Sequence, residues 1–171
     1  AAAKLHRDDP KSVEAIYDLD CLKSEVYLKT RLARPSCSRE LATVSDSVVP
    51  LMVELYLRGL DGYAYSSPDQ LEAEKRALRI GLIARVGASS HPAAYWFLQE
   101  IAEGLYRDEA AWSLAIGGMG RMDSPHSLPA LKGLYADAEG NLQRRAEILR
   151  AIGKQKTVQA WLYIEPILRS G

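Results

Sequence analysis

The residues best suited to acid–base or metal chemistry are the three histidines, His6, His91 and His126. His91 and His126 each precede a stretch with helical periodicity, and stacked helices could bring them to one edge beside Asp123. Such an edge would form a metal site or an acid–base pair. Ser124 corresponds to His91 in the repeat described below and is typical of the turn before a helix. We therefore favour a structural role for both histidines, and we expect His6 in a solvated, charged N-terminal stretch.

Sequence motifs of common catalytic sites are absent. The chain contains no HExxH metal motif, no GxSxG nucleophile motif and no phosphate-binding glycine loop. The run Gly117–Gly120 is rich in glycine but follows no predicted strand, so we expect it to permit close approach of two helices. Cys21 and Cys37 fit no zinc-binding spacing. Two buried free thiols are favoured, and one disulfide stays open for an exported protein.

Aromatic residues are the strongest candidates for a binding surface. Tyr95, Trp96 and Phe97 are consecutive, so a helix directs them to three sides and cannot bury all of them on one stripe. Trp161 corresponds to Tyr95 in the repeat, and Tyr163 corresponds to Phe97. Because Trp and Tyr are favoured anchors at interfaces, the predicted binding residues are Tyr95, Trp96, Trp161 and Tyr163. For each ring, packing between neighbouring helices is the more frequent arrangement and stays open.

The charge balance argues against nucleic acid as a partner. The 22 basic and 22 acidic residues cancel, so no overall charge attracts nucleic acid or an acidic membrane. Several arginines gather in the second half, where a solvated helix face is favoured over a basic patch: Arg79, Arg85, Arg121, Arg144, Arg145 and Arg150. Trp112 corresponds to Arg79 and Arg145, which predicts an exposed or half-exposed tryptophan.

Length and composition fit one soluble globular domain without a membrane span. The chain has 171 residues, 47% of them apolar, and no run approaches the roughly 18 apolar residues of a membrane helix. The start Ala-Ala-Ala is compatible with a mature end after A-x-A cleavage, with a cloning remnant, and with a domain cut from a longer protein. Localisation stays open, and the first case would make this an exported bacterial protein.

Helical periodicity runs along nearly the whole chain and predicts an all-α fold. No stretch alternates apolar and polar residues as a half-buried strand does. Ser67 and Pro68 have the residue types of an N-cap and of a first helical position, and we expect a helix to begin there. The expected helices are residues 10–32, 37–44, 46–60, 69–86, 92–105, 107–119, 126–138, 141–153 and 157–168.

A repeat of 33 residues organises the second half. Its glycines are Gly87, Gly120 and Gly153, and its apolar anchors are Leu98, Leu131 and Ile164. Pro92 and Pro125 also lie one step apart. We expect each glycine to end one helix in the left-handed conformation, and each proline to fit the first turn of the next. We expect each anchor to enter a shared core. Helix pairs this small bury their apolar faces only by stacking, which predicts an α-α superhelix of antiparallel pairs.

The segment Gly120–Leu131 resembles the short HEAT-like repeat of armadillo-like α-solenoids. Its most specific match is the run Leu128-Pro129-Ala130-Leu131, and Val49-Pro50-Leu51 is a weaker relative. The resemblance covers about residues 70–171. It implies one helical-repeat domain over 1–171, with atypical helices or a cap in 1–68 and three helix pairs in 69–171. The step of 33 also overlaps ankyrin and tetratricopeptide repeats, but the signature residues of both are absent.

The resemblance implies a non-catalytic scaffold that binds a partner protein or peptide on its concave surface, which second helices usually line. No cofactor is expected. Two enzyme-related alternatives stay open, because similar repeats occur in bilin lyases, which attach tetrapyrroles to phycobiliproteins, and in some DNA glycosylases. The balanced charge disfavours a glycosylase, since such an enzyme needs a basic groove for phosphates. The partner's identity and the oligomeric state stay open.

Overall fold

The computed structural model of the chain describes residues 46, 49–58, 68–105 and 108–170. Regular structure in these residues is helical throughout and includes no strand, which confirms the all-α prediction. Several predictions fall outside the described residues: the helices at 10–32 and 37–44, His6, Cys21, Cys37, and the loop over 61–67. The chain divides into two compact units, Ala1–Val86 and Gly87–Gly171, and each is described by itself.

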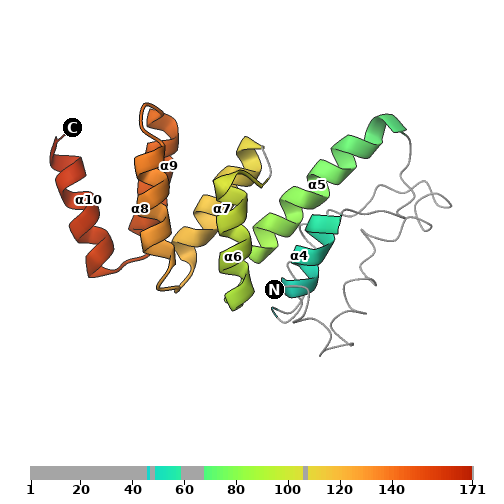
Figure 1. Cartoon of the computed structure of the whole chain (residues 1–171), viewed down its shortest axis with the longest axis horizontal. Coiled ribbons are helices and arrows are strands. Elements are labelled where there is room, and N and C mark those ends of the chain that lie inside the picture. The colour runs from blue at the N-terminus through green and yellow to red at the C-terminus, as the bar shows by residue number, and fades with distance from the viewer. Residues whose placement is uncertain (1–45, 47–48, 59–67, 106–107, 171) are drawn as a thin grey trace. The chain divides into compact units, whose positions relative to one another are not determined.

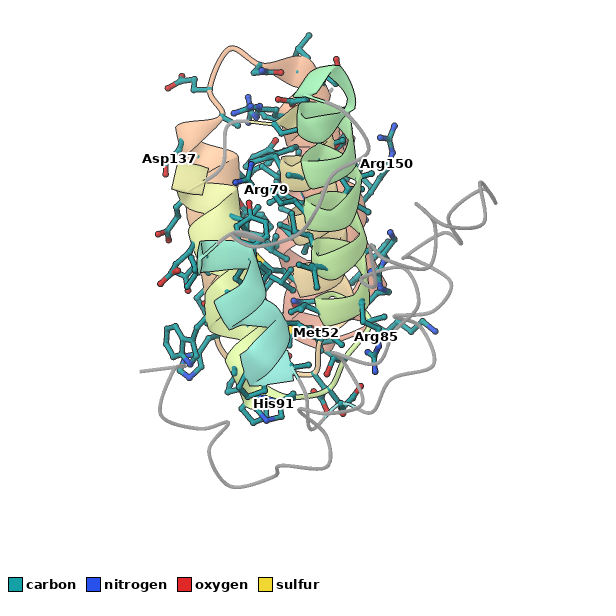
Figure 2. All side chains as sticks on the ribbon, turned by 90° about the vertical axis from the view of Figure 1, so that its right-hand side faces the viewer. Met52, Arg79, Arg85, His91, Asp137 and Arg150 are labelled. Carbon is teal, nitrogen blue, oxygen red and sulfur yellow. The ribbon has the colours of Figure 1, made fainter. Side chains whose placement is uncertain are left out.

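In the first unit, helix α4 (Val49–Arg58) packs against helix α5 (Pro68–Val86). Met52 is fully buried and lies on the side of α4 that is turned toward α5 (Figure 2). Pro68 opens α5, as predicted, because its missing N–H leaves no helical hydrogen bond unmade at that position. Near the end of α5, Arg85 forms an ion pair with Asp46, with Nη2 and Oδ1 2.7 Å apart.

The second unit contains five α-helices and a short π-helical turn. In chain order these are α6 (Pro92–Glu100), the π-turn Ile101–Leu105, α7 (Glu109–Arg121), α8 (Ser127–Asp137), α9 (Leu142–Lys154) and α10 (Val158–Ser170) (Figure 1). Helix α7 packs against α6, α8 and α9, and α9 packs against α8 and α10. Figure 2 shows Asp137 of α8 and Arg150 of α9 on opposite sides of the unit, so α8 and α9 belong to different layers.

The 33-residue step reappears in the helix boundaries and caps. Helices α7 and α9 begin 33 residues apart, at Glu109 and Leu142, and they end at the same step. Their N-caps, Asp108 and Asn141, keep the step as well. The Asp108 carboxylate accepts hydrogen bonds from the backbone N–H groups of Ala110 and Ala111, and Asn141 Oδ1 accepts one 3.0 Å long from a backbone N–H of its helix. A side-chain cap of this kind stabilises a helix by about 1 kcal/mol.

The predicted apolar anchors do enter the core. Leu98 and Leu131 are fully buried, and Ile164 is 8% exposed. Burying a side chain of this size contributes about 1.5–3 kcal/mol to folding. The anchors therefore secure α6, α8 and α10 against the other layer.

The left-handed role predicted for the repeat glycines is wrong. Gly120 and Gly153 lie inside α7 and α9, and the glycines with positive φ among the described residues are Gly104 (φ 109°) and Gly140 (φ 83°). Gly104 lies in the π-turn, where the expected helix 92–105 loses its α-helical geometry. Close packing explains Gly120 instead: a Cβ there would lie 2.5 Å from the carbonyl oxygen of Ala151. The prediction of close helix approach at the glycine run is thereby confirmed.

Candidate partner-binding surface

Tyr95, the first predicted binding residue, lies in the packing of α6 against the turn before α8. It is only 4% exposed, and its hydroxyl donates a hydrogen bond of 3.2 Å to the carbonyl oxygen of His126. Burial, and secondarily the negative charge of Glu103, raises the pKa of Tyr95 above its ordinary value of 10.0. The side chain therefore supports a neighbouring surface and offers little area of its own.

Trp96, the next predicted residue, is 57% exposed and lies at the centre of an aromatic cluster. Its ring meets the Tyr95 ring edge-on, with centroids 4.8 Å apart, and the His126 ring lies 5.5 Å away. His126 is also exposed. Rings in such contact lose little conformational freedom when a partner binds, so Trp96 is held ready for an apolar ligand.

Tyr163 and Trp161 take different positions on α10. Tyr163 is half-buried against α8, where its ring meets Tyr135 edge-on at 6.1 Å and the Lys132 ammonium lies 4.6 Å from its centroid. Burial first, and then Tyr135, raises the pKa of the Tyr163 hydroxyl. Trp161 is 58% exposed. The structure therefore does not gather all four predicted residues at one place: Tyr95 and Tyr163 join helices, and the two tryptophans meet solvent.

Exposed apolar residues form a wider surface that the sequence reasoning did not single out. The first row consists of Pro92, Pro125 and Val158, and the second row of Trp96, Pro129 and Leu162; all six are exposed. Within each row the step is 33 residues, and within each helix region the two members are four residues apart, hence on one helix face. We call these six residues the apolar ladder. The correspondence of Trp96, Pro129 and Leu162 was visible in the sequence, but their shared exposure was not.

Side-chain contacts join the helices that carry the apolar ladder. Trp96 of α6 touches His126 before α8, and Lys132 of α8 touches Tyr163 of α10. Leu162 is 63% exposed and Val158 is 71% exposed. The ladder therefore crosses three neighbouring helix regions with large apolar side chains turned to solvent. Contiguous exposed apolar area of this kind marks interaction surfaces.

Trp112 was predicted to be exposed or half-exposed, and this is wrong, since only 6% of it is accessible. The Arg144 guanidinium covers its ring, with Cζ 4.7 Å from the centroid, while two of its nitrogens hold the Glu109 carboxylate at 2.7 and 3.2 Å. The hydrogen bond from Arg144 is the main cause that lowers the pKa of Glu109. An outer helix position is thus buried by a cation from the next helix pair.

The arginines of the second unit serve mainly as partners of aromatic rings and carbonyls. Arg145 lies over the Tyr135 ring at 4.2 Å, and Arg121 Nη2 donates a 3.3 Å hydrogen bond to the carbonyl oxygen of Gly87. Arg150 is exposed and points away from α9 (Figure 2). These contacts spread the positive charge over separate structural tasks.

His91 acts as a helix cap, which agrees with the structural role favoured for it. Its Nδ1 accepts a hydrogen bond of 3.1 Å from the backbone N–H of Ala93 at the start of α6. Ser124 occupies the equivalent place before α8, where its hydroxyl accepts from the N–H of His126 at 3.3 Å. Within the part of the chain that the structure describes, no three His, Cys, Asp or Glu residues gather as metal ligands would.

Two searches complete the description of the surface. None of the described helices combines the length and apolar character needed to cross a bilayer. The chain matches no protein-family model, no curated protein and no solved structure.

Proposed function

We propose that this protein is a non-catalytic interaction module that binds a partner protein or peptide through the apolar ladder. The observation that carries the proposal is the pair of exposed apolar rows on α6, α8 and α10, with Trp96 and Leu162 as the largest side chains. Single exposed apolar residues are common on protein surfaces, but a contiguous set on three neighbouring helix regions is not. Trp is also the residue most enriched among energetic anchors of interfaces.

The scaffold we propose is a HEAT-like α-solenoid. Three observations support it: the common boundaries of α7 and α9, the caps Asp108 and Asn141 at the same step, and the buried anchors Leu98 and Leu131. In such an array α6, α8 and α10 are the second helices and line the inner surface. The apolar ladder then lies on the face that solenoids use for extended ligands.

The spacing of the apolar ladder favours an extended ligand. Packed helices lie about 8–10 Å apart, and a polyproline II segment advances about 9 Å in three residues. A segment with an apolar side chain at every third position would therefore place one side chain on each helix. Proline and tryptophan surfaces are suited to such segments, because the ligand is already extended before it binds.

The proposal is tested by affinity capture from the native source, followed by mass spectrometry. Three baits are compared: the unaltered chain, the double variant Trp96→Ser/Leu162→Ser, and the control Leu142→Ser. Leu142 is a sound control because it is 80% exposed but lies at the start of α9, in the other layer. We expect a protein that the unaltered and control baits retain and the double variant loses. Equal capture by all three baits would contradict the role of the ladder.

A further inference from the structure

A second apolar face lies on α10 and at the end of α9. Trp161 is 58% exposed and Leu168 is 64% exposed, and both lie on the same side of α10. Beside Trp161 is an open depression of about 390 Å³. It is lined by Gly153, Lys156, Thr157, Val158, Ala160, Trp161 and Ile164. We call this surface the Gly153 face.

Positions equivalent to the Gly153 face are covered elsewhere in the second unit. Tyr95 corresponds to Trp161 and is 4% exposed, because it packs beside His126. Tyr135 corresponds to Leu168 and is 7% exposed, under Arg145 and beside Tyr163. The Gly153 face therefore continues an established interface.

The established interface has a defined contact at its centre. A Cβ on Gly118 would lie 2.9 Å from the Cα of Gly87, and a Cβ on Gly120 would lie 2.7 Å from the Cα of Ala151. The two pairs are related by the 33-residue step. In each, a small residue of the later helix rests against the repeat glycine, and Gly153 is the next glycine in the series.

Each close contact is accompanied by a long side chain that donates to a backbone carbonyl. Arg121, three residues after Gly118, donates from Nη2 to the carbonyl oxygen of Gly87 at 3.3 Å. Gln155, four residues after Ala151, donates from Nε2 to the carbonyl oxygen of Met119 at 3.5 Å. The covering helix thus has a recognisable pattern: Gly or Ala, then Arg or Gln three or four residues later.

We propose that the Gly153 face docks a helix of a partner polypeptide that carries this pattern. The small residue of that helix rests on Gly153, its Arg or Gln donates to the carbonyl of Ile152 or Gly153, and its apolar side chains cover Trp161 and Leu168. This site is separate from the apolar ladder, and it does not depend on the ligand proposed there. Its chemistry follows from the two equivalent contacts already made within the second unit.

The test uses the full chain and a synthetic helix that copies residues 142–155, which include Ala151 and Gln155. The peptide is crosslinked on its solvent side, because isolated helices of this length are marginal in water. Isothermal titration measures its affinity for the unaltered chain, for Gly153→Leu and for Gly133→Leu. Both glycines are exposed helical positions: a Cβ on Gly153 meets only the Ile164 side chain at 3.8 Å, and one on Gly133 meets nothing within 4 Å.

We expect the peptide to bind the unaltered chain and Gly133→Leu equally, and Gly153→Leu at least about tenfold more weakly, since a filled seat costs more than 1 kcal/mol. A peptide with Ala151→Leu should weaken similarly. Thermal melts of both chain variants show whether each folds. Binding that ignores Gly153→Leu overturns the site, as does no binding to the unaltered chain. Sedimentation showing a dimer that Gly153→Leu dissociates would assign the face to a second copy and overturn the partner helix.

Discussion

The backbone of Gly120 lies directly against the backbone of Ala151, where α7 crosses α9. A Cβ on Gly120 would meet the oxygen, Cα and carbonyl carbon of Ala151 at 2.5, 2.7 and 2.9 Å. No side-chain adjustment can relieve a contact with backbone, so the helices themselves would have to separate. This contact sets the distance between the two helices.

Gly120→Ala should therefore destabilise the protein by about 2 kcal/mol, even though alanine favours helices over glycine by about 1 kcal/mol. The measurement is urea unfolding followed by circular dichroism. Gly133→Ala in α8 is the matched control and should gain about 0.5–1 kcal/mol, because its Cβ enters open space. Equal stability of the two variants would show that α7 and α9 do not touch at Gly120.

Lys156 is the residue with positive φ among the described non-glycine residues, at 52°. A side chain in the left-handed region costs about 1 kcal/mol, and glycine removes that cost while losing some entropy on folding. We expect Lys156→Gly to stabilise the protein by about 0.5 kcal/mol in the same unfolding experiment. Lys154→Gly, in the last turn of α9, should instead destabilise by about 0.5–1 kcal/mol. A loss at both positions would contradict the left-handed turn.

The ion pair of Glu109 with Arg144 should make stability depend on pH. The pKa of Glu109 is lowered in the folded state, mainly by the hydrogen bond from Arg144, so its contribution is present above the ordinary pKa of 4.5. That contribution is lost as the pH falls below 4.5 and passes through the lowered pKa. The side chains are 59% and 40% exposed, so about 0.5 kcal/mol is expected.

Unfolding of the unaltered chain and of Glu109→Gln, measured at pH 7 and at pH 2.5, checks this expectation. The two should differ by about 0.5 kcal/mol at pH 7 and converge at pH 2.5. Glu139→Gln, at an exposed residue in the turn after α8, controls for the loss of a carboxylate. A difference that persists at low pH would assign the effect to something other than the ion pair.

Periodicity predicted the helices of the second half well, because local pattern and tertiary burial agree there. Leu98, Leu131 and Ile152 were assigned to apolar faces from spacing alone, and all three are fully buried. Pro92 opens α6 because the fixed φ of proline suits a first helical position whatever lies around it. Such signals depend on a few neighbouring residues, and the sequence contains them directly.

The errors concern features that depend on a distant residue. Trp112 is buried because Arg144, which belongs to the following helix pair, covers its ring. Gly120 serves close packing against Ala151 and adopts no left-handed conformation. The sequence shows the residue types in both cases, but their roles come from contacts more than thirty positions apart.

The candidate surface was predictable in part. Trp96 and Trp161 were chosen for residue type and are exposed, whereas Tyr95 is held in packing by its hydrogen bond to His126. Pro129 and Leu162 share the repeat position of Trp96, but neither has the residue type of a typical anchor. Exposure at equivalent places on neighbouring helices, which only the structure supplies, joins them into the apolar ladder.

The most direct test of the account is the affinity of the captured partner for single variants on each helix of the apolar ladder. Trp96→Ala, Pro129→Ser and Leu162→Ala change α6, α8 and α10 in turn, and Leu142→Ser is the control. Isothermal titration should show at least about a tenfold loss for Trp96→Ala, smaller losses for the other two ladder variants, and no change for Leu142→Ser. Unchanged affinity in all three ladder variants, with each shown to fold, would contradict the central claim.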